Sequence, residues 1–354
     1  MIDIGNILIT VFYFVVVLSV LVLAHEIGHF IFARRYSVRV EEFGLGYPPR
    51  ALTLFKRGET AYTLNWLPLG GFVRMTGEEN PSDPRSFAAA KPWKRAVILV
   101  AGAGMNVVLA VALFSIMAMM GIPKPVEIVS IAGVTAGSPA QGAGLRPGDR
   151  ILAINGQTVI NRQDVMRASY EYAGQPISIE VKRDRENLNV NLTPRTKPPK
   201  NEGRIGITMT VQFLREEVVS YPIWEAIPYG INETISTGTQ IFGGFRRMAD
   251  GSAPAEVGGP VQIGQFTGLF CQRGLLPCMQ FTAILSVNLA IINLFPFPAL
   301  DGGRLVFVGI EVARRGKRVP PEMEGLVHFV GMAILLVLML IITVFDVQRL
   351  LPGG

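Results

Sequence analysis

The stretch ILITVFYFVVVLSVLVLAHEIGHFIF, residues 7–32, is an apolar run that carries two histidines and one glutamate near its end. A helix of about 20 apolar residues is long enough to cross the hydrocarbon core of a bilayer. Three further stretches, 96–122, 281–300 and 326–345, approach that length. The sequence therefore predicts a polytopic α-helical membrane protein with four transmembrane helices.

The composition agrees with a membrane protein and excludes several other classes. Hydrophobic residues make up 49% of the 354 residues and charged residues 17%, which is too apolar for a disordered chain or a single soluble domain. The net charge of +6 is spread along the chain without a basic tail, so we expect no nucleic-acid partner. Cys271 and Cys278 form no C-x-x-C pair. Unpaired thiols are their expected state, although a disulfide on the exported side is allowed.

Basic residues indicate how the four spans are oriented. They cluster after the first span, before the second and between the last two: Arg34, Arg35 and Arg39; Lys91, Lys94 and Arg95; Arg314, Arg315, Lys317 and Arg318. Because short cytoplasmic loops are rich in Lys and Arg, all three clusters are predicted to be cytoplasmic. Both termini and the long segment between the second and third spans are then extracytoplasmic.

Composition and predicted topology divide the chain into four parts. Period-two apolar runs such as 177–181 predict a small soluble β-rich domain after the second span. Apolar residues three and four apart, including Ile223, Ile227 and Ile231, predict an amphipathic helix at the membrane interface. The predicted parts are 1–124, with the first two spans; 125–211, the β-rich domain; 212–280, the amphipathic segment; and 281–354, with the last two spans.

The segment between the first two spans contains a predicted β-hairpin. Residues 51–66 form two strand-like runs around an Arg57-Gly58 turn. The flanking stretches 43–49 and 67–72 are apolar and rich in glycine, which is compatible with backbone that dips into a protected part of the membrane. The alternative is a simple connector between the spans.

The His25-Glu26-Ile27-Gly28-His29 segment carries the chemistry of the first span. Residues four apart lie one above the other on a helix, so the two imidazoles share one face and can bind one metal ion. Glu26 lies beside that face, where a carboxylate can accept a proton from water without occupying a coordination position. A pair of structural histidines with an incidental acid is the alternative, but ionisable side chains are expensive in a membrane helix.

A catalytic zinc site needs a third protein ligand and an open position. Asp301 and His328 are the candidates. Asp301 lies in NLFPFPALDGG, residues 293–303, at the end of the third span, where prolines break the helix. The predicted topology places Asp301 in the same cytoplasmic half of the membrane as His25 and His29, so Asp301 is the predicted ligand. His328 is interpreted as an interfacial or helix-packing histidine.

Three motifs together resemble one known family. They are H-E-x-x-H in the first span, N-x-x-P-x-P-x-L-D-G-G at the third, and G-L-x-P-G-D-x-I-x-x-I-N-G at 144–156, which resembles a PDZ domain. The whole chain is similar to the site-2 protease family of intramembrane zinc metalloproteases, and more narrowly to the bacterial regulator-of-sigma-E protease branch. Well-known proteobacterial members have two PDZ domains in tandem, whereas this chain has room for one.

The resemblance implies a site and its cofactor. One Zn²⁺ per chain would be held by His25, His29 and Asp301, with Glu26 as the catalytic acid and base. Asn293 matches the motif asparagine, which implies a role in substrate binding or in stabilising the reacting centre. Asn106, in a small-residue stretch of the second span, matches a pattern of the branch. It either hydrogen-bonds substrate or a metal ligand, or it only belongs to a closely packed helix face.

The resemblance also implies a function. The protein would be a multi-pass enzyme of a bacterial inner or cell membrane that cleaves transmembrane segments of single-span proteins, such as trimmed anti-sigma factors or remnant signal peptides. Its partners would be these substrates, the lipid bilayer and peptide C-termini bound by the PDZ domain. The hairpin would be a membrane-reentrant loop that captures an extended substrate segment. A metal transporter and an inactive PDZ scaffold are the other function classes compatible with the residues.

Overall fold

The computed structural model describes residues 4–78, 82–199, 202–251 and 258–349. The chain forms two compact units. The membrane unit combines residues 1–120 with 221–354, and the PDZ-like unit comprises residues 121–220.

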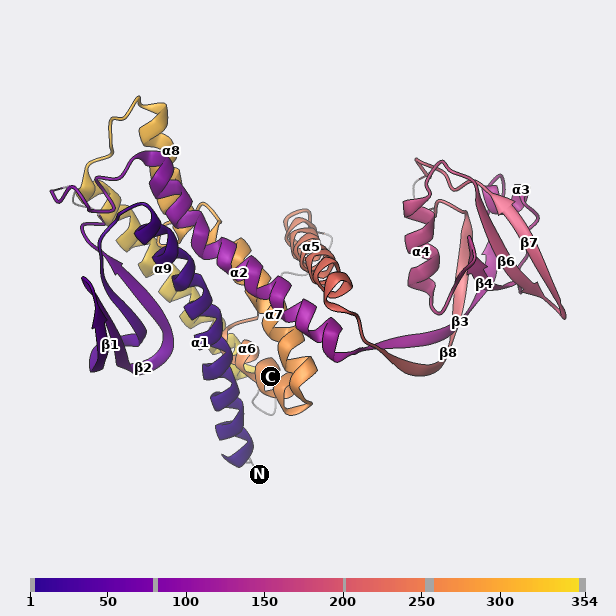
Figure 1. The fold of residues 1–354 in the computed structure, drawn as a ribbon, viewed down its shortest axis with the longest axis horizontal. Coiled ribbons are helices and arrows are strands. Elements are labelled where there is room, and N and C mark those ends of the chain that lie inside the picture. The colour runs from indigo at the N-terminus through magenta and orange to yellow at the C-terminus, as the bar shows by residue number, and fades with distance from the viewer. Residues whose placement is uncertain (1–3, 79–81, 200–201, 252–257, 350–354) are drawn as a thin grey trace. The chain divides into compact units, whose positions relative to one another are not determined.

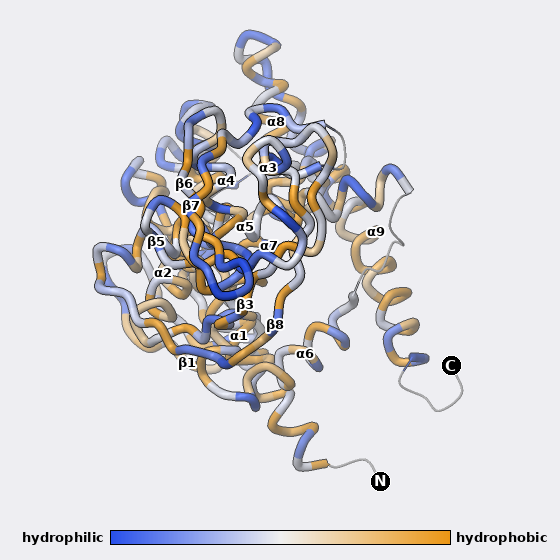
Figure 2. Tube along the Cα trace, turned by 90° about the vertical axis from the view of Figure 1, so that its right-hand side faces the viewer, coloured by the Kyte–Doolittle hydropathy of each residue, from blue (hydrophilic) through white to orange (hydrophobic). Residues whose placement is uncertain are grey.

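Four helices of the membrane unit are long and apolar enough to cross a membrane. They are α1 (Ile4–Arg35), α2 (Pro92–Met120), α7 (Leu275–Asn293) and α9 (Pro321–Gln348). Protein buries only 6% of the most apolar window of α9, and Figure 2 shows predominantly hydrophobic residues along that helix. An exposed apolar helix surface of this kind is stable in lipid and unfavourable in water. The predicted polytopic helical architecture is confirmed.

Three further helices belong to the membrane unit: α5 (Ile223–Ala249), α6 (Pro260–Gln272) and α8 (Asp301–Ala313). α5 lies where the amphipathic helix was predicted and packs against α2 and α7. Residues 252–257 of the same predicted segment lie outside the described residues. The presence of α8 differs from the prediction, in which the third span continued to residue 300 and Asp301 lay at its end. Instead α7 ends at Asn293 and Asp301 begins a separate helix, since Pro296 and Pro298 cannot continue α7.

Cys271 and Cys278 form a disulfide, so the prediction of unpaired thiols was wrong. α6 ends at Gln272 and α7 begins at Leu275, so the chain reverses within a very short connection. Gly274 makes this reversal with a φ of +128°, a conformation that glycine adopts without strain. The two cysteine Cα atoms are thereby brought to 4.1 Å.

β1 (Val40–Arg57) and β2 (Thr60–Met75) form a sheet beside α1, in which the predicted hairpin is only one part (Figure 1). Residues 42–45 of β1 pair with two parts of β2, 61–64 and 71–74. Residues 50–57 pair with 60–65. Within the described part of the chain, the sheet therefore has two edges, 50–57 and 71–74, and the second lies on the side of α1.

The PDZ-like unit is rich in β-structure, as predicted. Five strands form the order β7-β6-β4-β3-β8, and β5 pairs with β4. Its strands and helices are β3 (Ile122–Val134), α3 (Pro139–Gly142), β4 (Arg150–Ile154), β5 (Gln157–Thr158), α4 (Arg162–Glu171), β6 (Ile177–Arg183), β7 (Glu186–Leu192) and β8 (Ile207–Val219). Its core includes Val129, Ile131, Ile151, Val165, Ile177, Ile179 and Val181.

The aspartate of the G-L-x-P-G-D turn, Asp149, holds this turn in place. Asp149 is 1% exposed and accepts hydrogen bonds from Arg183 Nε at 2.7 Å and from the Arg146 amide at 2.9 Å. The hydrogen bonds from the Arg183 guanidinium hold the pKa of Asp149 below its usual value. The turn after α3 is therefore fixed to β6 by a buried charge.

Candidate metal centre and active site

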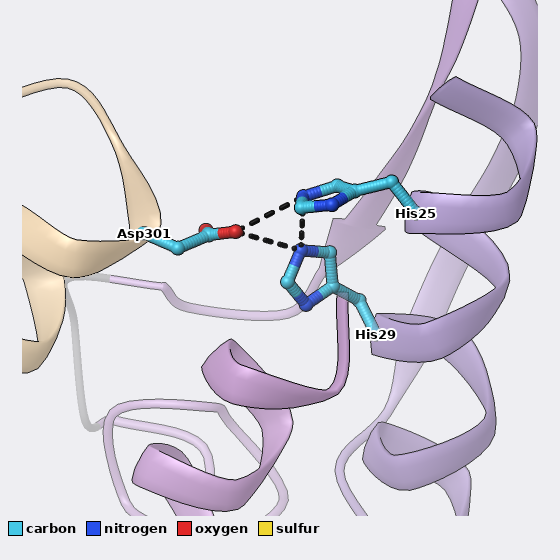
Figure 3. A group of neighbouring side chains, drawn as sticks. All are labelled: His25, His29 and Asp301. Atoms are coloured by element: carbon cyan, nitrogen blue, oxygen red, sulfur yellow. Dashed lines mark hydrogen bonds and ion pairs between the residues drawn. The ribbon is translucent and has the colours of Figure 1, made fainter. Parts of the chain in front are cut away.

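His25, His29 and Asp301 meet at one point in the membrane unit (Figure 3). The two histidines project from consecutive turns of α1, and Asp301 is the first residue of α8. The Nε2 atoms of His25 and His29 are 3.0 Å apart, and Asp301 Oδ2 lies 3.0 Å from the first and 3.2 Å from the second. Both histidines are buried, with side chains that are 10% and 8% exposed. Three donor atoms of the types that zinc prefers thus converge from two helices.

Gly102 of α2 keeps the space beside these donors open. A Cβ atom at this position would lie 2.5 Å from His29 Nε2 and 2.7 Å from His25 Cε1. Gly28 allows α1 and α2 to pack at this level, because a Cβ there would lie 2.1 Å from the Ala101 carbonyl oxygen. The residues present therefore fit a small metal ion, and a side chain at position 102 would obstruct it.

The second nitrogen of His29 fixes that ring for metal binding. His29 Nδ1 lies 2.8 Å from the Ile98 carbonyl oxygen, which can only accept a hydrogen bond. Nδ1 therefore carries the proton, and the Nε2 lone pair is directed to the centre. This arrangement is typical of histidines that bind metals.

The second nitrogen of His25 faces two asparagines. Its Nδ1 lies 3.4 Å from the side-chain nitrogens of both Asn106 and Asn293. Asn106 is fully buried, and its Oδ1 has no hydrogen-bond partner among the described residues. A metal ion at His25 Nε2 requires the proton on Nδ1, and an asparagine amide rotated by half a turn would accept it through oxygen. Both predicted asparagines thus lie on the side of His25 that faces away from the donor cluster.

Glu26 is half-buried and lies next to the three donors without being one of them. Its carboxylate interacts electrostatically with His29, His25 and Asp301, and with the backbone amide of Val73. Val73 belongs to the 71–74 edge of β2. The carboxylate is therefore placed between the donor cluster and a strand edge, a contact that no sequence motif had indicated.

Comparison with known proteins decides the family. The model of peptidase family M50 matches residues 13–338. The chain belongs to peptidase family M50. It is 30% identical to the regulator of sigma-W protease RasP of Bacillus subtilis over 426 residues, covering 96% of this chain and 99% of that one. It is also 30% identical to the zinc metalloprotease RasP of Geobacillus kaustophilus over 417 residues, covering 95% and 97%.

Two other proteins are also similar to this chain, one along most of its length and one only in part. A Clostridium perfringens protein, provisionally named a zinc metalloprotease, is 38% identical over 336 residues, covering 93% of this chain and 96% of that one. The PDZ domain of an SdrC-like protein from Listeria monocytogenes matches with 24% identity and a TM-score of 0.21, covering 23% of this chain and 86% of that one. The M50 protein is thus a multi-pass zinc metalloprotease of the site-2 protease family, as the sequence motifs predicted.

A folded-back loop positions Asp301 in this M50 peptidase. A Cβ at Gly302 would lie 2.1 Å from the Phe295 carbonyl oxygen, and one at Gly303 would lie 2.3 Å from that of Phe297. Both glycines of the LDGG motif are therefore required by the close approach of the loop to α8. Ala299 has a φ of +78°, which is strained for a residue with a Cβ.

His328 holds this loop and is not part of the donor cluster. Its Nδ1 accepts a hydrogen bond of 3.0 Å from the Ala299 amide, two residues before Asp301. The ring also lies 5.4 Å from that of Phe307 on α8. The interpretation of His328 as a packing histidine is correct but incomplete, because no sequence pattern indicated its contact with the Asp301 loop.

Ion pairs hold α8 against the rest of the M50 membrane unit. Arg95 of α2 pairs with Glu311 of α8, and both side chains are more than nine-tenths buried. Arg304, one turn after Asp301, pairs with Glu78 at 2.8 Å. Removing one partner of a buried pair leaves an uncompensated charge, so these contacts fix the position of α8.

We predict that replacing His328 with Leu lowers zinc affinity by about 10-fold to 100-fold, the range found when an outer-shell contact of a metal ligand is lost. His328→Asn should lose less, because its amide oxygen can accept the Ala299 N–H near the position of Nδ1. Competition with a chelator of known affinity measures the effect on the purified protein. Equal zinc affinity in wild type, His328→Leu and His328→Asn would contradict the positioning role.

Proposed function

We propose that this intramembrane zinc metalloprotease cleaves transmembrane segments of other membrane proteins, with His25, His29 and Asp301 as the zinc ligands and Glu26 as the acid and base. The observation that carries the assignment is the convergence of three donor atoms within 3.0 to 3.2 Å of one another. Bound zinc supplies a Lewis acid that makes water a better nucleophile at neutral pH and polarises a peptide carbonyl.

The protein's own residues perform the remaining steps. Glu26 is close enough to the donors to accept a proton from the attacking water and to deliver it to the leaving amine nitrogen. The Ile98 carbonyl orients His29, and Asn106 and Asn293 orient His25. The LDGG loop and His328 hold Asp301. The buried position of the site limits access by bulk water.

We assign the end of α1 that carries the site to the cytoplasmic half of the membrane. Contacts between the basic clusters support this orientation: Arg95 and Arg318 both pair with Glu311, and Arg318 also donates to the Ala88 carbonyl. Lys94 of the second cluster lies 5.8 Å from the centre of the Tyr36 ring, and Tyr36 directly follows Arg34 and Arg35 of the first cluster. The clusters thus gather at one end of the unit, as the positive-inside rule requires. The termini and the PDZ-like unit are then extracytoplasmic.

The substrate class that fits this site is a single-span membrane protein, such as a trimmed anti-sigma factor or a remnant signal peptide. A relative named as a regulator of a sigma factor supports the first of these. The PDZ-like unit would either exclude untrimmed proteins or bind newly formed C-termini, since backbone capture of a terminal carboxylate is a common mode of peptide recognition.

The 71–74 edge of β2 is the natural place for an unwound substrate. This edge lies beside Glu26, because a Cβ at Gly71 would lie 4.0 Å from Glu26 Cγ and the Val73 amide interacts electrostatically with the Glu26 carboxylate. The other edge, 50–57, belongs to the part of the sheet around the predicted hairpin. An extended peptide that adds to the first edge would place its backbone beside the catalytic groups.

We predict that cleavage of a synthetic single-span peptide depends on backbone N–H groups with a period of two. In an added strand only every second amide points to the 71–74 edge. N-methylation of these alternate residues near the cut should therefore inhibit cleavage, and N-methylation of the residues between them should leave cleavage unchanged. Mass spectrometry of the products from the reconstituted protein locates the cut and measures its rate.

The same peptides distinguish strand addition from simple helix unwinding. N-methylation weakens a helix at every position, so faster cleavage at all positions would favour unwinding alone and contradict strand addition. A cut outside the hydrophobic segment would contradict the proposed function itself.

A further inference from the structure

A pocket lined by arginines lies at the end of α1, away from the metal centre. Its volume is about 330 Å³, and it is formed by the last turn of α1, the start of β1, the β1–β2 turn and Arg85. Its charged lining consists of Arg34, Arg39, Arg57, Arg85 and Glu59. Four positive charges therefore face one negative charge.

The single glutamate is already engaged. Glu59 pairs with Arg85 and lies 3.9 Å from Arg39 Nε. Arg34 and Arg57 pair with no carboxylate among the described residues, and Arg34 lies 5.6 Å from the centre of the Phe30 ring. These two guanidinium groups remain available, and guanidinium groups bind phosphate oxygens in a bidentate manner.

Aromatic residues indicate the depth of this pocket in the membrane. Tyr36 adjoins the pocket residue Ser37, and its ring lies 5.2 Å from that of Trp93 at the start of α2. Lys94 Nζ lies 5.8 Å and 5.9 Å from the centres of these two rings. Tyrosine and tryptophan gather at the level of lipid headgroups, where lysine also reaches water. The pocket is thus at the depth where lipid phosphates lie.

We propose that this pocket binds the phosphate headgroup of an anionic phospholipid. The net positive lining, the two unpaired arginines and the depth of the pocket together favour a lipid phosphate over a soluble anion. Because the β1–β2 turn forms one wall, a bound lipid would hold the tip of the sheet at the membrane surface. The sheet's 71–74 edge adjoins Glu26, so the lipid would also steady that edge.

The test is a titration of the detergent-solubilised full-length protein with dioctanoylphosphatidylglycerol, followed by native mass spectrometry. The variant Arg34→Gln/Arg57→Gln should bind this lipid about tenfold more weakly or worse, because each basic residue contributes substantially to the attraction of an anionic lipid. The matched control is Arg314→Gln/Arg315→Gln, which removes the same charge from exposed residues in the α8–α9 connection. This control should bind like the wild type.

Three further measurements make the test decisive. The single variant Arg57→Gln changes one exposed residue at the turn and should show an intermediate loss, which separates lipid binding from a folding defect. Equal loss in the pocket variant and the matched control would overturn the proposal, because general surface charge would then explain binding. Equally strong binding of dioctanoylphosphatidylcholine, or displacement of the lipid by similar concentrations of inorganic phosphate, would also overturn it.

Discussion

Replacing Glu26 with Gln is expected to reduce cleavage by about 10²-fold to 10⁴-fold and to leave the zinc content unchanged, since this is the contribution of a positioned acid or base. Glutamine has the size of glutamate but cannot take a proton from water at neutral pH. Glu26 is not one of the three converging donors, so the metal should stay in place. Single-turnover cleavage of a single-span substrate and metal analysis of the same sample measure both quantities.

The matched control for this substitution is Glu225→Gln. Glu225 is exposed in the first turn of α5, and the change removes the same charge without touching the site. This variant should cleave at the wild-type rate. Activity of Glu26→Gln within a few-fold of the wild type would contradict the role of Glu26, whereas joint loss of zinc and activity would make Glu26 part of the metal site.

Replacing Asp301 with Asn is expected to remove both zinc and activity. The amide has nearly the same shape but no charge, so the site would lose its anionic donor while the loop keeps its fold. The loss of zinc affinity should exceed the roughly 10-fold to 100-fold expected when only an outer-shell contact is removed. Chelator competition on the purified variants measures the series.

The expected order of zinc affinity distinguishes the roles of the residues around the centre. Asp301→Asn should be the weakest, His328→Leu intermediate, and Glu26→Gln close to wild type. The place of each variant in this order follows from a contact of the residue that it changes. Asp301 Oδ2 faces both imidazoles, His328 holds the loop two residues before Asp301, and Glu26 lies beside the donors. Wild-type zinc affinity in Asp301→Asn would remove Asp301 from the ligand set.

Local sequence patterns predicted the parts of this fold that depend on local physics. Hydropathy over about 20 residues identified the four helices that, within the described residues, are long and apolar enough to cross a membrane, because lipid demands an apolar surface along the whole span. The spacing of His25 and His29 placed them on one face of α1, since a helix repeats every 3.6 residues. The topology argument brought Asp301 to the same half of the membrane, and the structure places the three donors together.

Contacts between residues far apart in the sequence could not be predicted, because local sequence patterns do not show which distant residues meet. His328 touches the Asp301 loop from another helix, and Arg95 meets Glu311 across 216 positions of sequence. The Cys271–Cys278 disulfide depends on a reversal at Gly274 that hydropathy alone does not reveal. Residues 42–45 pair with two parts of β2, 61–64 and 71–74. The sequence pattern predicted only the hairpin at residues 51–66 and not these additional strand pairs.

The same limit explains the error at α8. Asp301 was expected at the end of the third span because the apolar run continues almost to residue 300. Instead, the two prolines prevent α7 from continuing, so α7 ends at Asn293. A loop follows, and α8 begins at Asp301. A helix N-terminus also favours an anionic side chain, so the first position of α8 suits Asp301.

The most direct test of the central claim, that His25, His29 and Asp301 hold the zinc, is X-ray absorption spectroscopy at the zinc edge of the purified full-length protein. We predict a first shell of nitrogen and oxygen only, at about 2.0 to 2.2 Å, with the multiple-scattering signature of two imidazoles. This shell should disappear in Asp301→Asn. Sulfur at about 2.3 Å, a single imidazole, or a folded and active protein without zinc would contradict the assignment.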